Sequence, residues 1–184
     1  IGWRQAALLD YGFQGTFPSF MIETGQLRPE FLMRFLSYPF VNGSFSQAIF
    51  AGVMLLALGK FVGEIMASFS VFLLYVLSTI GGALAMWALG GEGDWLFGGF
   101  PPVYGLIGGY SFVMWRRLLG SGGPQYQAFT LIALLMGLQL FWGIFFETGF
   151  LWVAELAGFI CGFGLSFLVA PGEWTRLRAR LQQR

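Results

Sequence analysis

The sequence predicts an all-α fold in which a bundle of helices crosses a membrane, and three observations support that class. First, 57% of the residues are hydrophobic and only 10% are charged, whereas about a quarter of the residues in soluble domains are charged. Second, apolar stretches close to the length of a membrane span alternate with short polar or glycine-rich connections. Third, basic residues gather at the ends of these stretches, as membrane topology requires. We therefore expect a polytopic membrane protein with five spanning helices in this chain.

The composition also excludes several classes of function. A net charge of +1 gives no case for nucleic acid as a partner. The single cysteine excludes an internal disulfide framework, and the absence of histidine removes the commonest metal ligand and general base. We expect no cofactor, no metal and no soluble small-molecule substrate. The expected partners are lipid and other integral membrane proteins.

Residues 1–45 are amphipathic and contain no apolar run of the roughly 20 residues that a span needs. They mix aromatic and aliphatic side chains such as Trp3 and Leu8 with charged ones such as Arg4 and Asp10. We expect a partly helical loop that lies in the membrane interface on the extracytoplasmic side. Within it, Arg34 is expected to order the loop as a hydrogen-bond donor.

The next region, residues 46–171, is expected to form the transmembrane core. Its predicted spans cover residues 46–58, 67–89, 101–115, 128–146 and 150–170. The first ends at Lys60 and is short unless residues 42–47 dip into the membrane, and the last is stopped by Pro171 and Gly172. Residues 172–184 form a basic tail that is predicted to be an amphipathic helix at the cytoplasmic surface.

The distribution of basic residues predicts the orientation. If the five spans alternate, seven basic residues fall on one side of the membrane and three on the other; the seven are Lys60, Arg116, Arg117, Arg176, Arg178, Arg180 and Arg184, and the three are Arg4, Arg28 and Arg34. The positive-inside rule then places the C-terminus in the cytoplasm. An odd number of spans places the N-terminal loop outside, which suggests a further span upstream of Ile1. A bacterial inner membrane is the expected location.

Two predicted helices carry glycines on one face. In the segment that opens at Pro101, Gly105, Gly108 and Gly109 lie three and four residues apart. In the last span, Gly158 and Gly162 share a face with Glu155. Since a glycine has no Cβ, another backbone can approach such a face closely, and we expect these two helices to pack against each other.

Together these segments resemble the rhomboid intramembrane serine protease family over roughly residues 25–170. The resemblance rests on Tyr38-Pro39-Phe40-Val41-Asn42-Gly43-Ser44-Phe45 before the first span, on Gly59-Lys60 and Glu64 after it, and on the two glycine-bearing helices that follow. Active rhomboids are similar across these stretches. They carry a Gly-x-Ser-Gly at the top of the glycine-rich helix and an Ala-His-x-x-Gly-x-x-x-Gly on the last shared span. In those active rhomboids the Ser is the nucleophile and the last-span His is its base, and a His and an Asn on the first span are among the oxyanion donors.

This chain departs from that pattern at every catalytic position. The resemblance places Pro101 at the nucleophile, Glu155 at the base, Gln47 at the first-span His and Ala51 at the Asn. Covalent catalysis needs a nucleophile within reach of a base, and proline has neither a hydroxyl nor an N–H group. The resemblance therefore implies a rhomboid pseudoprotease with no enzymatic activity.

Two functions from different classes remain open. One is a binding module that holds transmembrane helices of other membrane proteins, as an assembly or stability factor or as an accessory subunit; its candidate contacts are Phe141, Trp142, Phe145, Glu155 and Gln47. The other is an intramembrane hydrolase with atypical chemistry centred on Glu155. A channel is disfavoured, because conduction paths normally show several ionisable residues. Glu155 itself has three possible roles: a structural hydrogen bond to Gln47 or Tyr104, contact with a partner, or proton chemistry.

Overall fold

The computed structural model describes residues 2–26, 28–91, 93–145 and 150–170, without the side chains of residues 4, 140 and 142–145. Helices make up most of this part of the chain: α1 (Gly2–Tyr11), α2 (Thr16–Thr24), α3 (Pro29–Ser37), the 3₁₀ turn η1 (Tyr38–Phe40), α4 (Phe45–Gly63), α5 (Ser68–Leu89), α6 (Phe100–Ser121), the 3₁₀ turn η2 (Gln125–Phe129), α7 (Thr130–Phe145) and α8 (Leu151–Val169). Two-residue strands β1 (Phe13–Gln14) and β2 (Trp95–Leu96) pair antiparallel.

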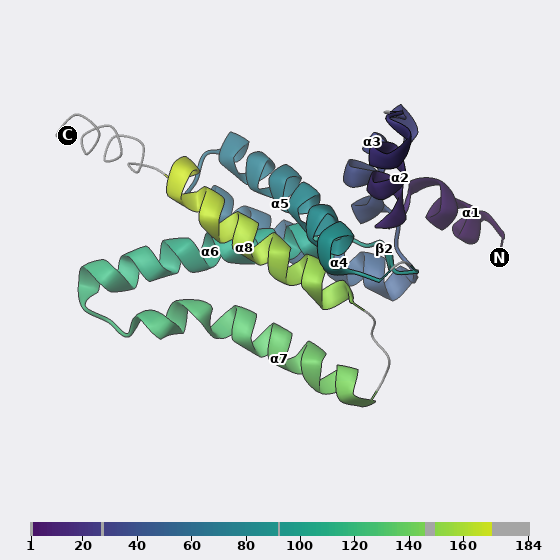
Figure 1. Ribbon diagram of the computed structural model, residues 1–184. Coiled ribbons are helices and arrows are strands. Elements are labelled where there is room, and N and C mark those ends of the chain that lie inside the picture. The colour runs from purple at the N-terminus through teal and green to yellow at the C-terminus, as the bar shows by residue number, and fades with distance from the viewer. Residues whose placement is uncertain (1, 27, 92, 146–149, 171–184) are drawn as a thin grey trace.

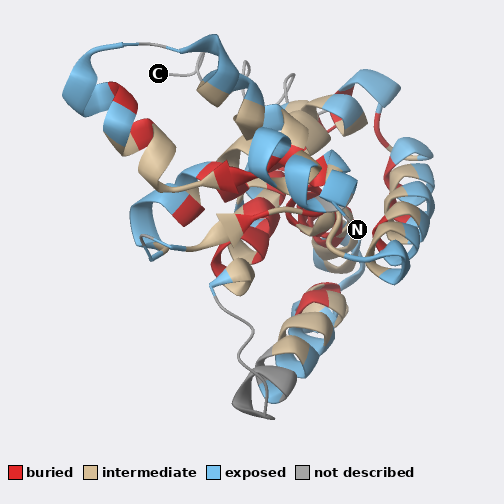
Figure 2. Ribbon diagram, turned by 90° about the vertical axis from the view of Figure 1, so that its right-hand side faces the viewer, coloured by how far each residue is buried: buried red, intermediate tan, exposed pale blue. Residues whose placement is uncertain are grey.

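Helix α6 is the centre of the bundle. It packs most extensively on α8 and also contacts α5 and α4, while α5 lies against α8 (Figure 1). Helix α7 runs along the outside with much less contact to α6, and α1–α3 sit at one end of the bundle. Figure 2 shows that buried residues concentrate where the central helices meet. The main core accordingly includes Leu74 of α5 together with Leu106, Ile107 and Phe112 of α6.

Three helices among the described residues, α4, α5 and α8, are long and apolar enough to cross a membrane. Helix α6 has 22 residues, but its glycines and the charged pair Arg116 and Arg117 lower its hydropathy. The described part of α7 has 16 residues, about four short of a typical span. The predicted all-α membrane bundle is confirmed, whereas the count of five spans stays a prediction.

The first spanning helix is longer than the sequence suggested. We expected a short span over residues 46–58, and α4 instead runs for 19 residues from Phe45 to Gly63. The Ser44 hydroxyl caps its start by accepting a hydrogen bond from the Gln47 N–H at 3.1 Å. Lys60 lies in the last turn, where a positive charge is favourable to the helix dipole, so it does not end the helix. The short first span was therefore wrong.

The N-terminal region is more ordered than a loop. Arg34 donates a hydrogen bond to the carbonyl of Gly12 at 3.2 Å, and its guanidinium lies 4.6 Å from the centroid of the Phe17 ring. These contacts tie α3 to the turn before β1 and to α2, so the predicted ordering role of Arg34 is confirmed. The strand pair was not predicted, because two residues are too few to show an alternating pattern. The basic tail expected at 172–184 lies outside the described residues.

Tyr38 connects this region to the transmembrane bundle. Its hydroxyl donates to the carbonyl of Thr79 in α5 at 2.8 Å, and its side chain is fully buried. Burial, and secondarily Tyr75, raise the pKa of Tyr38 well above its usual value, so the phenol remains a neutral donor. The N-terminal helices are thereby anchored beside the middle of the bundle.

Candidate functional site

The start of α6 forms the centre of the candidate site. Pro101 and Pro102 occupy its first turn, where a missing N–H group leaves no helical hydrogen bond unmade. Pro101 is fully buried between two glycines of neighbouring helices. A Cβ built at Gly82 of α5 would lie 2.9 Å from the Cβ of Pro101, and one built at Gly158 of α8 would overlap the Pro101 carbonyl. The proline is therefore enclosed by backbone on two sides.

The glycine faces bring α6 and α8 together. A Cβ at Gly162 would overlap the carbonyl of Gly105, and one at Gly108 would overlap the carbonyl of Phe159. A Cβ at Gly109 would lie nearest to α5, 2.9 Å from the Leu74 side chain, and 3.5 Å from the Ser166 hydroxyl oxygen of α8. The two backbones can approach this closely only because these positions carry no side chain.

Glu155 lies in a small polar cluster where three helices meet. Its side chain is only 6% exposed, and the Gln139 side chain of α7 hydrogen-bonds its carboxyl group. The hydroxyl of Tyr104 in α6 donates to the Gln139 Oε1 atom at 3.4 Å, so Gln139 stands between the other two residues. The Glu155 Oε2 atom has no hydrogen-bond partner among the described residues. We call Tyr104, Gln139 and Glu155 the polar cluster.

Gln47 and Ala51 of α4 face the turn that leads into α6. Gln47 Oε1 accepts a hydrogen bond from the Gly43 N–H at 3.0 Å. Gly98, with a φ of +94°, comes so close to the Gln47 amide that a Cβ would lie 2.6 Å from its Nε2 atom. A Cβ at Gly99 would lie 3.6 Å from that of Ala51. These two positions therefore lie beside the residues that precede Pro101.

The structure thus brings together part of what the sequence grouped. Gln47, Ala51 and Pro101 lie around the start of α6. Glu155 lies on α8 about one helical turn before Gly158, the residue that packs on Pro101. Of the two hydrogen-bond partners considered for Glu155, Tyr104 lies in its cluster. Gln47 instead bonds the backbone of Gly43.

The sequence analysis missed Gln139, which links Glu155 to Tyr104. A signal was available, because Gln139 is the one strongly polar side chain in the apolar sequence of α7. A polar side chain inside a span usually faces a polar partner, and that rule was applied to Glu155 and not to Gln139.

The proposed binding surface on α7 is only partly described. Phe141 is 53% exposed on this helix. The side chains of Trp142 and Phe145 lie outside the described residues. Exposed apolar residues on a spanning helix contact either lipid or another helix, so exposure by itself does not distinguish the two.

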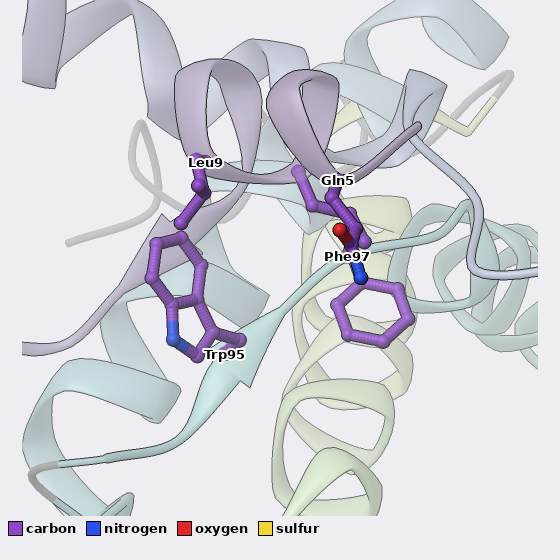
Figure 3. A pocket seen from close by; sticks show the side chains of 5 residues that line it. Gln5, Leu9, Trp95 and Phe97 are labelled. Carbon is purple, nitrogen blue, oxygen red and sulfur yellow. The ribbon is translucent and has the colours of Figure 1, made fainter. Parts of the chain in front are cut away.

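Two cavities lie away from Pro101, at the end of the bundle covered by α1–α3. One, of about 420 Å³, is lined by Gln5, Leu8 and Leu9 of α1 and by Trp95 and Phe97 of the β2 segment (Figure 3). The other, of about 390 Å³, lies between α2 and the end of α5. Neither of these two cavities is lined by Pro101, Glu155, Gln47 or Ala51.

The geometry limits the chemistry that this site can perform. Pro101 offers no nucleophilic group. Glu155 lies beside the phenol of Tyr104 and the side-chain amide of Gln139. Within the described ranges, no three His, Cys, Asp or Glu side chains are placed to share a metal ion. The polar cluster does provide a buried hydrogen-bond acceptor, the Glu155 Oε2 atom, beside α7.

These features define a helical membrane protein organised around close α6–α8 packing, with a polar cluster inside the bundle. Comparison with family models gives a match to the Rhomboid domain over residues 29–172. The chain therefore belongs to the rhomboid family. No curated protein and no solved structure matched the sequence.

Proposed function

We propose that this chain is a rhomboid pseudoprotease that binds transmembrane helices of other membrane proteins and does not hydrolyse them. In this role it acts as an assembly or stability factor, or as an accessory subunit of a membrane complex. The observation that carries the proposal is Pro101 at the position where family resemblance places the nucleophile. A buried proline between Gly82 and Gly158 leaves no hydroxyl at the start of α6.

The remaining catalytic positions support the same proposal. The sequence contains no histidine, so no imidazole base is available at position 155 or elsewhere in these 184 residues. Gln47 and Ala51 stand where the resemblance places the oxyanion donors, and Gln47 already bonds Gly43. Loss of nucleophile and base together removes the covalent route.

An intramembrane hydrolase centred on Glu155 is the alternative, because the Oε2 atom of this residue has no partner among the described residues. Aspartyl-type hydrolysis uses two carboxylates that share a water. Among the described residues, Glu155 lies beside the Gln139 amide and the Tyr104 phenol. This arrangement favours a hydrogen-bonding role over a hydrolytic one.

The partner helix is proposed to bind along α7. This helix contacts the bundle sparsely, and it carries the exposed Phe141 on the same element as Gln139. Trp142 and Phe145 extend this surface in the sequence. Glu155 and Gln47 are the candidate hydrogen-bond contacts of the partner helix. Dispersion between aromatic and aliphatic side chains would supply the rest of the attraction.

The proposed topology has five spans in this chain, with α6 and α7 crossing the membrane beside α4, α5 and α8. Because α6 packs along α8 over most of its length, the two helices are expected to share the same membrane depth. Arg116 and Arg117 then mark the cytoplasmic end of α6, and the C-terminus is cytoplasmic. We propose the bacterial inner membrane as the location.

Site-specific photocrosslinking tests this function. A benzoylphenylalanine at Phe141, in cells at native expression, should give a crosslinked product with one defined membrane protein. The matched control is the same probe at Phe72 of α5, which is 61% exposed and is expected to crosslink only lipid. Trp142→Ala combined with Phe145→Ala should abolish the Phe141 product while the fold persists. Crosslinks to lipid alone at both sites would contradict the proposal.

A further inference from the structure

A cleft between α2 and the end of α5 has the chemistry of a cation site. It is lined by Thr16, Ser19, Phe20 and Glu23 of α2 and by Trp87 and Gly90 at the end of α5, and its volume is about 390 Å³. We call it the α2–α5 cleft. The lining combines a carboxylate, two hydroxyls and two aromatic rings, and none of its side chains is basic. None of these residues belongs to the site around Pro101.

The indole of Trp87 is held in a fixed orientation at this cleft. Its Nε1–H donates to the Ser19 hydroxyl at 3.0 Å. A Cβ at Gly15 would lie 3.4 Å from the Cα of Trp87, so the start of α2 also packs directly on this turn of α5. Because the only donor of the indole is already used, what Trp87 offers a ligand is its ring. The face of an indole attracts cations, and quaternary ammonium groups most characteristically.

Two further features make the cleft electronegative. Glu23 contributes a carboxylate from α2. Gly90 is the C-cap of α5, and the last carbonyls of a helix carry its negative dipole end and lack intrahelical donors. Asp94, close by, is bonded through its Oδ2 atom to the Gly91 N–H at 2.9 Å. Carboxylate, helix end and aromatic ring together favour a positively charged ligand with an organic surface.

Anionic groups of a ligand also have partners here. The Ser19 hydroxyl accepts from Trp87, so its own hydrogen remains able to donate. A zwitterionic head group suits this lining, because its phosphate matches the hydroxyls of Thr16 and Ser19 while its ammonium matches Glu23 and Trp87.

The position of the cleft indicates where such a ligand comes from. Helix α5 is apolar enough to cross the membrane, and Trp87 stands in its last turn. Tryptophan at the end of a span lies at the level of the lipid head groups. We propose that the α2–α5 cleft binds the ammonium end of a zwitterionic phospholipid head group, held between Glu23, Trp87 and the C-terminus of α5.

Native mass spectrometry of the purified full chain tests this site. The protein is offered phosphatidylethanolamine and phosphatidylglycerol with identical acyl chains, and the lipid retained on each protein molecule is counted. The wild type should retain one phosphatidylethanolamine in preference to phosphatidylglycerol. Glu23→Gln should lower this preference roughly fivefold, because it removes the charge and keeps the shape. The control is Glu30→Gln, which makes the same charge change on α3, outside the cleft, and should leave the preference intact.

Two more variants distinguish loss of the Trp87 aromatic ring from loss of the fold. Trp87→Phe keeps an aromatic face and should retain part of the preference, whereas Trp87→Leu should remove it; equal thermal unfolding of the two shows that both are folded. Soluble phosphoethanolamine identifies the source: displacement of the lipid shows that the head group alone suffices, and its failure shows that the acyl chains are required. An unchanged preference in Glu23→Gln, or equal retention of the two lipids by the wild type, would overturn the proposal.

Discussion

The contact between α6 and α8 can be tested by adding one methyl group. Gly158→Ala places a Cβ where it overlaps the Pro101 carbonyl oxygen and lies 2.9 Å from the Pro101 carbonyl carbon and 3.2 Å from its Cα. All three atoms belong to backbone, which cannot turn aside as the end of a side chain can. The two helices must therefore separate, and the packing of Gly162 on Gly105 is disturbed with them.

The chain offers a matched control on the same helix. A Cβ at Gly164 of α8 meets nothing within 4 Å. Both substitutions gain the helix propensity of alanine over glycine, about 1 kcal/mol, so this gain cancels in the comparison. The difference that remains is the cost of overpacking, about 1–3 kcal/mol. For a chain of this size, that corresponds to a difference in melting temperature of about 2–12 °C.

Thermal unfolding in a mild detergent is the assay, with both variants and the wild type purified in parallel. We expect Gly164→Ala to unfold at or above the wild-type temperature and Gly158→Ala to unfold below it. Equal melting temperatures for the two variants would refute close backbone packing between α6 and α8 at this point.

Three further predictions concern the polar cluster, the chemistry and the topology. Gln139→Leu removes the partner that Tyr104 and Glu155 share, and should lower stability in detergent by about 0.6–2 kcal/mol; no change would mean that the cluster does not hold α7. Pro101→Ser should remain unreactive toward fluorophosphonates because no histidine is present; labelling of the wild type that disappears in Glu155→Ala would instead favour the hydrolase. In a Cys161→Ala background, cysteines at Ser121 and Gln183 should react only with membrane-permeant reagents and one at Ser19 with impermeant reagents added outside; opposite results at two of these sites would reverse the orientation.

Much of the fold was predictable because the relevant signals are local. The helices begin and end within a few residues of the predicted spans, except that α4 continues past Lys60 to Gly63 and α6 continues past Arg117 to Ser121. A charge near the end of a helix is compatible with its dipole, so it was a poor stop signal. The strand pair joins Phe13 to Leu96, and no local pattern could reveal a pairing of two residues at that separation.

The assignment of Pro101, Glu155, Gln47 and Ala51 to former catalytic positions rests on the family resemblance alone and stays a prediction. The partner of Glu155 could not be identified in that way, because Gln139 is contributed by a different helix. The α2–α5 cleft was also absent from the sequence analysis, since it forms only when α2 packs on the last turn of α5.

By itself, the sequence determined that this protein is a helical membrane protein with two glycine-faced helices, because hydropathy and residue spacing are properties of the chain that survive without contacts. Only the tertiary structure decided which polar groups meet inside the bundle. Tyr104 and Gln139 are 35 residues apart, and their hydrogen bond depends on how α7 lies along α6 and α8. The physical reason is that a buried polar atom must find its partner across helices, and that choice is made by packing, which sequence periodicity does not encode.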